Sequence, residues 1–332
     1  MSYGLTVELL GEVLPLSKLI SVSSLHRQVQ RVGERMDGEL GEEQMFFIEG
    51  CPLEWAELPR PEMPLVVGLD GGYVHSCERK ARKDSCFEVI VGKSVTTNGS
   101  SKCFGFVNCY DTKPKRRLFE VLKSQGMQMN QQVTFLSDGG DTVRELQLYL
   151  NPEAEHLLDW FHITMRLTVM QQMAKGLGPE GSESRTSALK ELESIKWYLW
   201  HGNVFQALQH INFLEMDLDG EVKTGERAKK LLRTAGEFYT YIENNQRWIP
   251  NYGDRYRHGE MISTGFVEST VNQVIAKRMV KKQQMRWTKR GAHLLLQVRT
   301  RVLNEEFRGT FSGWYPGMRV TSGAEGQEEL AA

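Results

Sequence analysis

Hydrophobic runs between residues 64 and 160 predict a sheet whose strands are interrupted by helices. The segment from Pro64 to Asp70 is short, apolar and closed by an acid, which fits a buried strand better than a helix. The same reasoning predicts further strands at four segments: Phe87–Val95, Lys102–Tyr110, Gln132–Ser137 and His156–Trp160. Helices are predicted between them, at Arg116–Gly126 and Asp141–Leu150. Asp70 and Asp138 then stand at the C-terminal ends of the first and fourth strands.

The pattern becomes helical after residue 162. From Ile163 to about Arg247, apolar residues recur at spacings typical of packed amphipathic helices. We expect the aromatic side chains of this region to lie in its core, rather than to form a base-stacking platform: Trp197, Tyr198, Trp200 and Phe205. Gly265–Met285 and Lys289–Phe307 each carry an apolar stripe, and each is predicted to be a single helix.

The composition is that of a globular protein of 332 residues, 40% of them hydrophobic and 25% charged. The longest apolar runs are far too short to span a membrane, and the N-terminus shows no export signal. The five cysteines form no CxxC pair and no Cys/His quartet, so neither a zinc ribbon nor a disulfide framework is indicated. Reduced thiols in the cytoplasm are expected.

A formal net charge of -1 conceals a basic segment near the C-terminus. Between Lys277 and Arg308 there are ten Lys or Arg residues against two acids. Five of them recur at helical spacing, and we expect these to bind the DNA backbone: Lys277, Arg278, Lys281, Lys282 and Arg286. The alternative is a solvated, charged helix face.

The first 37 residues are predicted to form short helices. Polar and basic residues on the second of these helices would suit a helix-turn-helix recognition helix: His26, Arg27, Gln30 and Arg31. An ordinary solvated helix face explains them equally well. Residues 38–63 are acidic and rich in proline, which is typical of a linker.

Three acids form a candidate metal centre: Asp70, Asp138 and Glu268. Adjacent strands of one sheet can bring Asp70 and Asp138 together, and Glu268 lies at the edge of the apolar stripe of its helix. Phosphodiester cleavage uses two divalent cations about 3.5–4 Å apart, and hard cations such as Mg²⁺ take carboxylate ligands. Each acid alone is explained by a turn or a solvated helix edge. Their joint placement, followed by a basic helix, favours a site.

Several short segments in a fixed order make the chain similar to a known family. They are GLDGG (68–72), FLSDGGD (135–141), LDWFH (158–162), GFVESTVN (265–272), QMRW (284–287) and RGAHLLL (290–296). Over residues 1 to 308, the chain thereby resembles DDE transposases of bacterial insertion sequences, in particular the ISKra4 type.

The resemblance implies an α/β fold with a ribonuclease-H-like mixed sheet, in which Asp70, Asp138 and Glu268 are the catalytic triad and hold Mg²⁺ or Mn²⁺. It also implies double-stranded DNA as partner and substrate, a homo-oligomer that pairs two DNA ends, no membrane association and a place in the cytoplasm at the nucleoid. Secondary site candidates are Asp159 and His162, which form a DxxH element, and Asn272. For His162, a histidine satisfied at a helix start is an equally good explanation.

The interval from Asp138 to Glu268 is too long for one strand and loop, so the helical stretch is expected to interrupt the catalytic fold. The predicted organisation is therefore as follows: N-terminal helices 1–37, linker 38–63, catalytic domain 64–162, helical insertion 163–260, catalytic domain resumed at 261–308, and tail 309–332. Similar transposases often have a longer N-terminal region with a cysteine-rich metal module. The resemblance thus leads us to expect an N-terminally truncated copy.

Two other functions remain open at this stage. A truncated element could persist as a non-catalytic DNA-binding remnant, which would keep the fold and the basic helix. A ribonuclease-H-like nuclease would share the metal chemistry. The helical insertion and the basic C-terminal segment favour transposition over the nuclease.

Overall fold

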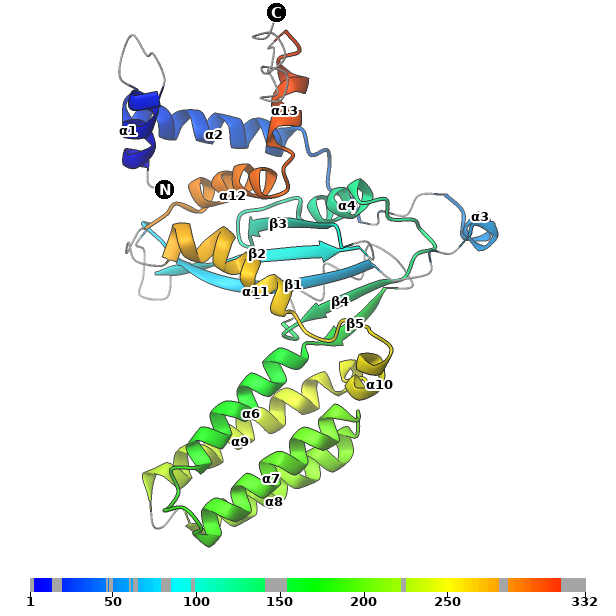
Figure 1. Ribbon diagram of the computed structural model, residues 1–332, viewed down its shortest axis with the longest axis vertical. Helices are drawn as coiled ribbons and strands as arrows, with labels where there is room; N and C mark the ends of the chain where they lie inside the picture. Colours follow the sequence, from blue (N-terminus) through cyan, green and yellow to red (C-terminus); the bar gives the residue numbers. More distant parts are fainter. Residues whose placement is uncertain are drawn as a thin grey trace, which may run out of the picture.

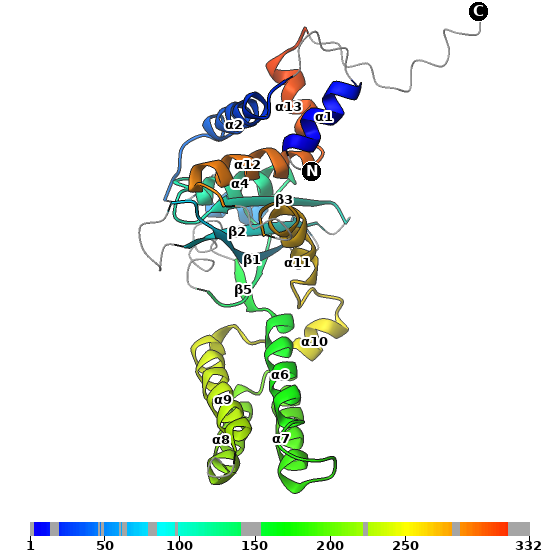
Figure 2. The same cartoon turned by 90° about the vertical axis from the view of Figure 1, so that its left-hand side faces the viewer.

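The structure of the chain is a computed structural model, and it is described for residues 3–13, 20–45, 47, 50–59, 61, 65–78, 85–96, 99–140, 154–221, 225–280 and 286–317. A mixed sheet lies at its centre. Helices from both ends of the chain gather on one side of this sheet, and a long helical bundle projects from the opposite side (Figures 1 and 2). Within the described ranges, no helix has the length and apolar character needed to cross a bilayer.

The sheet has five strands in the order β3-β2-β1-β4-β5. β1 (Leu65–His75) pairs antiparallel with β2 (Cys86–Val95), which in turn pairs antiparallel with β3 (Ser101–Val107). On its other side β1 pairs parallel with β4 (Val133–Ser137), and β4 pairs parallel with β5 (Glu155–Leu158). These pairings confirm the α/β class and the mixed sheet that the sequence predicts.

The prediction that the first strand ends at Asp70 is wrong. β1 continues to His75 because its antiparallel partner β2 keeps pairing as far as Cys86. The parallel partner β4, by contrast, pairs with β1 only from Leu65 to Gly68. Asp70 therefore lies inside a strand, at the level where the neighbouring strand β4 has ended.

Other predicted bounds shift by a few residues. β3 ends three residues before the predicted Tyr110, and β5 ends two residues before the predicted Trp160. Helix α4 (Pro114–Ser124) begins two residues before the predicted Arg116. The helix predicted at 141–150 lies outside the described residues.

Alternate residues of β1 belong to two hydrophobic cores, one on each face of the sheet, because strand side chains point to opposite faces in turn. The odd positions pack with α4 on one face: Leu65, Val67 and Leu69. On the other face, Val74 packs with Val274 and Ile275. Asp70 is an even position, so it shares the face of Val74.

The segment predicted as one helix from Gly265 to Met285 consists of two different helices. α11 (Gly265–Val271) is an α-helix, and it continues directly into η4 (Asn272–Val280), which is a π-helix with a wider turn. Residues 281–285 lie outside the described part of the chain. The apolar spacing predicts a helix correctly here, but it does not distinguish α from π hydrogen bonding.

The projecting bundle has four helices, namely α6 (Trp160–Ala174), α7 (Glu183–Trp200), α8 (Val204–Glu221) and α9 (Glu226–Asn245) (Figure 1). Their inward side chains form a hydrophobic core of their own. The chain then returns towards the sheet through η3 (Gln246–Trp248) and α10 (Tyr252–Arg257).

Two of the four aromatic residues expected in this core are not buried. Trp197 is 51% exposed and Phe205 is 68% exposed, whereas Tyr198 and Trp200 pack against the core as predicted. The prediction fails for the first pair because they lie on the outer faces of α7 and α8, which no described element covers.

Helices from the two chain ends pack together beside the sheet. α2 (Val22–Gly38), which follows α1 (Tyr3–Val13), lies along α12 (Lys289–Leu303), and an ion pair joins Glu34 of α2 to Arg290 of α12. α12 ends at Leu303, four residues before the predicted end at Phe307. A separate helix, α13 (Phe307–Trp314), extends into the segment predicted as a tail, and a short helix, α3 (Pro52–Glu57), lies in the predicted linker.

α12 covers the open edge of the sheet at β3. The Gln297 Nε2 donates to the carbonyl of Gly105 at 3.1 Å. The Asn304 side chain accepts from the backbone N–H of Cys103 at 2.8 Å and donates to the carbonyl of the same residue at 2.9 Å. Polar side chains of a helix thus satisfy backbone groups that a further strand would otherwise pair with.

Candidate metal centre

Asp70 and Asp138 lie at the same level on neighbouring parallel strands. The β1–β4 register pairs Leu65 with Val133 and continues to Gly68 opposite Leu136. Asp138 follows the last residue of β4, and two residues beyond the last printed pair the direction of the two strands leads to Asp70 and Asp138, whose charges interact. The structure therefore brings these acids side by side, although 68 residues separate them in the sequence.

Glu268 reaches the same place because α11 packs directly on β1. Gly68 shares the face of Asp70, and a Cβ atom at this position would overlap the side chains of Val267 and Phe266. The absence of a side chain at Gly68 lets the helix come against the strand. Glu268 is the next residue after Val267, so the close packing of α11 on β1 places its carboxylate near enough to Asp70 for the two charges to interact.

The pKa values of Asp70 and Glu268 are both raised. For Asp70 the largest cause is burial, to which the charges of Asp138 and Asp159 add, while a 2.8 Å hydrogen bond from the N–H of Gly71 and the charge of His162 act in the opposite direction. Burial is also the largest cause for Glu268, followed by the charge of Asp70. Burial and neighbouring negative charge thus disfavour the ionised form of both acids, and a bound cation would favour it.

Asp159 and His162 stand beside this group of acids. The fully buried Asp159 caps α6 by accepting from the N–H of Phe161 at 3.0 Å, and it also accepts from the N–H of Thr264 at 2.9 Å, at the start of α11. One carboxylate thereby ties the first residue of the bundle to the helix that carries Glu268.

His162 is held by the same carboxylate, with its Nδ1 2.7 Å from Oδ2 of Asp159. Burial by itself lowers the pKa of His162, but the hydrogen bond and charge of Asp159, with the charges of Asp70 and Asp138, outweigh burial and raise it. Both descriptions of His162 in the sequence analysis therefore fit. It is satisfied at a helix start, and it faces the acids.

The three acids are more widely spaced than the ligands of a single ion. In the described part of the chain, one group of three acidic, cysteine or histidine side chains has all its ligand atoms within 4.8 Å, and this group is Asp37, Asp111 and His293. A centre with two cations about 3.5–4 Å apart accommodates a wider set of acids, because only a bridging acid has to reach both ions.

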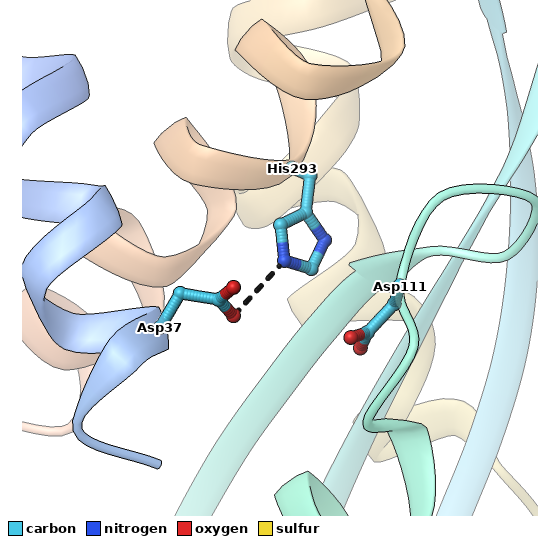
Figure 3. A group of neighbouring side chains, drawn as sticks. All are labelled: Asp37, Asp111 and His293. Atoms are coloured by element: carbon cyan, nitrogen blue, oxygen red, sulfur yellow. Dashed lines mark hydrogen bonds and ion pairs between the residues drawn. The ribbon is translucent and has the colours of Figure 1, made fainter.

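The group of Asp37, Asp111 and His293 has the spacing of a metal site, and Figure 3 shows how its three side chains converge. A guanidinium is already bound there. Arg117 donates to Asp37 at 2.7 Å and to Asp111 at 2.9 Å, and its side chain is nearly inaccessible. His293 contacts Asp37 at 3.2 Å. The arginine supplies the positive charge that a metal would supply, so this group is an ion-pair network that joins α2, α4 and α12.

Other predicted site residues are placed as follows. Asn272 is exposed and begins η4, one turn beyond Glu268. Among the predicted DNA-binding residues, Arg286 is exposed. The side chains of Lys277 and Arg278, and the whole of 281–282, lie outside the described part of the structure.

The four polar and basic residues singled out on the second N-terminal helix differ in their exposure. His26, Arg27 and Arg31 are exposed on α2, but Gln30 is buried and donates to the carbonyl of Gly291 at 3.4 Å. Gln30 is therefore part of the contact between α2 and α12, so it belongs neither to an exposed recognition face nor to a solvated one. Gln30 lies on the buried side of α2, together with Gly33 and Met36.

Two residues beside Asp138 were missed by sequence reasoning. Tyr241 of α9 donates from its Oη to the carbonyl of Asp138 at 3.2 Å, and Arg166 of α6 lies 4.1 Å from the centre of the Tyr241 ring. Their sequence positions are 75 residues apart and carry no shared motif, so only the packing of α6 against α9 could show them.

The acids, the histidine and this arginine thus come from four separate segments of the chain, namely β1, the end of β4, α6 with its N-cap, and α11. Compared with protein-family models and with curated proteins, the chain matches none of them.

Proposed function

We propose that the chain is a DDE transposase, which cleaves and joins DNA strands at the ends of an insertion sequence with the help of Mg²⁺ or Mn²⁺. One observation carries the proposal. Asp70 lies near Asp138, which directly follows the neighbouring strand β4, and it shares its face of the sheet with α11, which carries Glu268. A ribonuclease-H-like sheet with a helical insertion is part of the proposal, and the mixed sheet and the four-helix bundle are compatible with it.

The residues present fit a divalent metal centre. Asp70, Asp138 and Glu268 offer carboxylate oxygens, which are the ligands that Mg²⁺ and Mn²⁺ take. Burial first, and neighbouring acids second, raise the pKa values of Asp70 and Glu268, and a bound cation would offset both effects. When bound there, the cations would activate the attacking hydroxyl and stabilise the leaving oxygen.

The remaining residues of the site have supporting roles in this proposal. Asp159 fixes the start of α6 against the start of α11, and so holds Glu268 in place relative to the sheet. His162, oriented by Asp159, faces the acids and is placed to hydrogen-bond the oxygens of a bound phosphodiester.

Double-stranded DNA is the proposed partner. Arg286 is exposed, and its neighbour Trp287 is anchored to the end of β1, the strand that carries Asp70, by a hydrogen bond of 2.9 Å to the carbonyl of His75. The backbone next to Arg286 is therefore anchored at the end of β1, five residues beyond Asp70, and counterion release there would favour binding of the DNA backbone. A homo-oligomer that pairs two DNA ends, acting at the nucleoid, completes the proposal.

The experiment is a nicking assay on a DNA duplex that carries the inverted repeats flanking the reading frame. With Mg²⁺ or Mn²⁺, we expect Asp70→Asn, Asp138→Asn and Glu268→Gln each to lower the nicking rate at least about a hundredfold, because each would remove a group that helps to stabilise transition-state charge. DNA binding without metal should persist.

The matched control is Glu260→Gln. Glu260 pairs with Arg255 at 2.8 Å, outside the group of acids, so its loss should leave nicking nearly unchanged. Normal cleavage by Glu268→Gln together with an inactive Glu260→Gln would show that the third acid is misassigned. A wild-type protein that binds DNA but never cleaves it would instead support the non-catalytic remnant, and cleavage confined to RNA–DNA hybrids would support the nuclease.

A further inference from the structure

An arginine of the helical bundle is fixed in place beside the proposed metal centre. Arg166 of α6 lies with its guanidinium 4.1 Å from the centre of the Tyr241 ring. Tyr241 is fixed in its turn, because its hydroxyl donates to the carbonyl of Asp138 at 3.2 Å. A guanidinium on an aromatic face is held by cation–π attraction and stacking, which limits its orientation.

Arg166 is also close to the acids along its own helix. It follows His162 by four residues, so both side chains lie on the same face of α6, one turn apart. His162 interacts electrostatically with Asp70 and Asp138. Arg166 therefore lies on the same face of α6 as His162, one turn further from the acids.

The charge of Arg166 is not neutralised by an acid. The residue is exposed, and within the described ranges no carboxylate forms an ion pair with it. Other arginines of the chain do have such partners, as Arg117 has in Asp37 and Asp111. An oriented cation that has no acidic partner is suited to an anion brought by a ligand.

A ligand can reach this guanidinium. Arg166 lines an open groove of about 230 Å³ between α6 and α9, together with Met165, Val169 and Phe238. Thr234 and Glu237 complete its wall, and Glu237 forms its ion pair with Arg233 at 2.9 Å.

From these contacts we infer that Arg166 binds a backbone phosphate of the DNA, one that flanks the phosphodiester held at Asp70 and Asp138. The helical bundle then contributes a substrate-binding residue, and Tyr241 is the platform that positions it. Arg166 is well suited because its planar fork can donate two parallel hydrogen bonds to one phosphate. The inference rests on the proposed function, since it takes DNA as the ligand of the acids.

The test measures binding of a fluorescein-labelled duplex carrying the inverted repeat, in Ca²⁺, over a range of salt concentrations. For Arg166→Ala we expect the Kd to rise about tenfold, which is the loss of one charge-assisted hydrogen-bonding group. The slope of log Kobs against log salt should become shallower by about 0.9, as for one phosphate contact. Arg166→Lys should restore the slope, because it restores the charge.

The control is Lys190→Ala, which removes the same charge from an exposed position on α7. This variant should leave the Kd and the slope close to those of the wild type. Tyr241→Phe keeps the ring and removes the hydrogen bond to Asp138, so it should reduce the nicking rate while changing the salt slope little. Since Arg166 is exposed, its variants should unfold at the wild-type midpoint; Arg166→Gln, which keeps most of the side-chain length, replaces Arg166→Ala if the latter is unstable.

The outcomes separate the inference from the proposed function. If the wild type nicks DNA while Arg166→Ala keeps its Kd, its slope and its nicking rate, Arg166 does not contact DNA and the inference is overturned alone. If the wild type neither binds nor nicks the duplex, the proposed function is overturned and the inference falls with it.

Discussion

Two groups of acids in this protein have opposite electrostatics. In the first, the hydrogen bonds of His293 and Arg117 and the charge of Arg117 outweigh the effect of burial, and they hold the pKa of Asp37 far below its usual range. In the second, burial and neighbouring acids raise the pKa values of Asp70 and Glu268. The first group contains its own cation, Arg117, whereas no ion pair with an arginine or lysine is found at Asp70, Asp138 or Glu268 in the described part of the chain.

The difference separates a structural from a functional use of the same residue types. Arg117 joins α2, α4 and α12, so its ion pairs contribute to the fold. A raised pKa means that the charged carboxylates of Asp70 and Glu268 are unfavourable in the folded, metal-free protein. Groups with shifted pKa values are found most often at functional sites, where a bound ligand can stabilise the charge. A close geometric spacing alone would have selected the wrong group, because it ignores the arginine that is already bound.

The largest expected effect is on stability, from Arg117→Ala. This variant leaves Asp37 and Asp111 partly or fully buried without their cation, which typically costs about 3–5 kcal/mol of unfolding free energy. Urea unfolding followed by circular dichroism measures it. A loss below about 1 kcal/mol would mean that the network is well solvated, and the contrast between the two groups would then disappear.

A substitution at Gly68 tests whether close packing builds the second group. In Gly68→Ala the new Cβ would overlap the side chain of Val267, so α11 has to move away from β1. We expect a loss of about 1–3 kcal/mol from overpacking, together with a strong loss of nicking because Glu268 is displaced.

The control for Gly68→Ala is Gly38→Ala, since a Cβ at Gly38 meets nothing within 4 Å. Gly38→Ala should leave the unfolding free energy and the nicking rate nearly unchanged. Full nicking activity in Gly68→Ala would mean that Glu268 does not depend on this contact, and the role given to Glu268 would have to be withdrawn.

A smaller effect is an opposite pH dependence of the two groups in EDTA. The folded-state pKa of Asp37 lies below its unfolded value of about 3.9, so its contribution to stability is full above that value and is lost as the pH falls. The stability difference between wild type and Asp37→Asn should therefore shrink as the solution is acidified.

For Asp70 the sign is reversed, because its folded-state pKa lies above the unfolded value. The charged form is the unfavourable one, so Asp70→Asn should stabilise the metal-free protein at neutral pH, and this gain should vanish in acid. Urea unfolding of the wild type and both variants between neutral and acidic pH measures how the stability difference between wild type and each variant changes with pH. Slopes of the same sign would contradict the distinction between the groups.

The parts of this structure that the sequence predicts well depend on neighbouring residues. The apolar run before Asp138 and the apolar stripe around Glu268 are local patterns, and both lead to the correct element. The end of β1 was missed because Gly71 and Gly72 have low strand propensity, and only pairing with the distant β2 keeps the strand going.

The network around Arg117 could not be predicted for a related reason. Its members come from α2, the loop after β3, α4 and α12, and nothing near Asp37 in the sequence points to residues beyond 100. The same holds for the contact between Arg166 and Tyr241. In both cases the packing of helices distant in sequence determines which side chains meet.

The most direct test of the central claim is a titration with Mn²⁺, in which free Mn²⁺ is followed by electron paramagnetic resonance for the wild type, Asp70→Asn and Asp37→Asn. We expect the wild type and Asp37→Asn to bind Mn²⁺ alike, and Asp70→Asn to bind it at least about tenfold more weakly, as loss of a metal-site residue does. Wild-type binding by Asp70→Asn together with lost binding by Asp37→Asn would place the metal at the Arg117 network and would contradict the account.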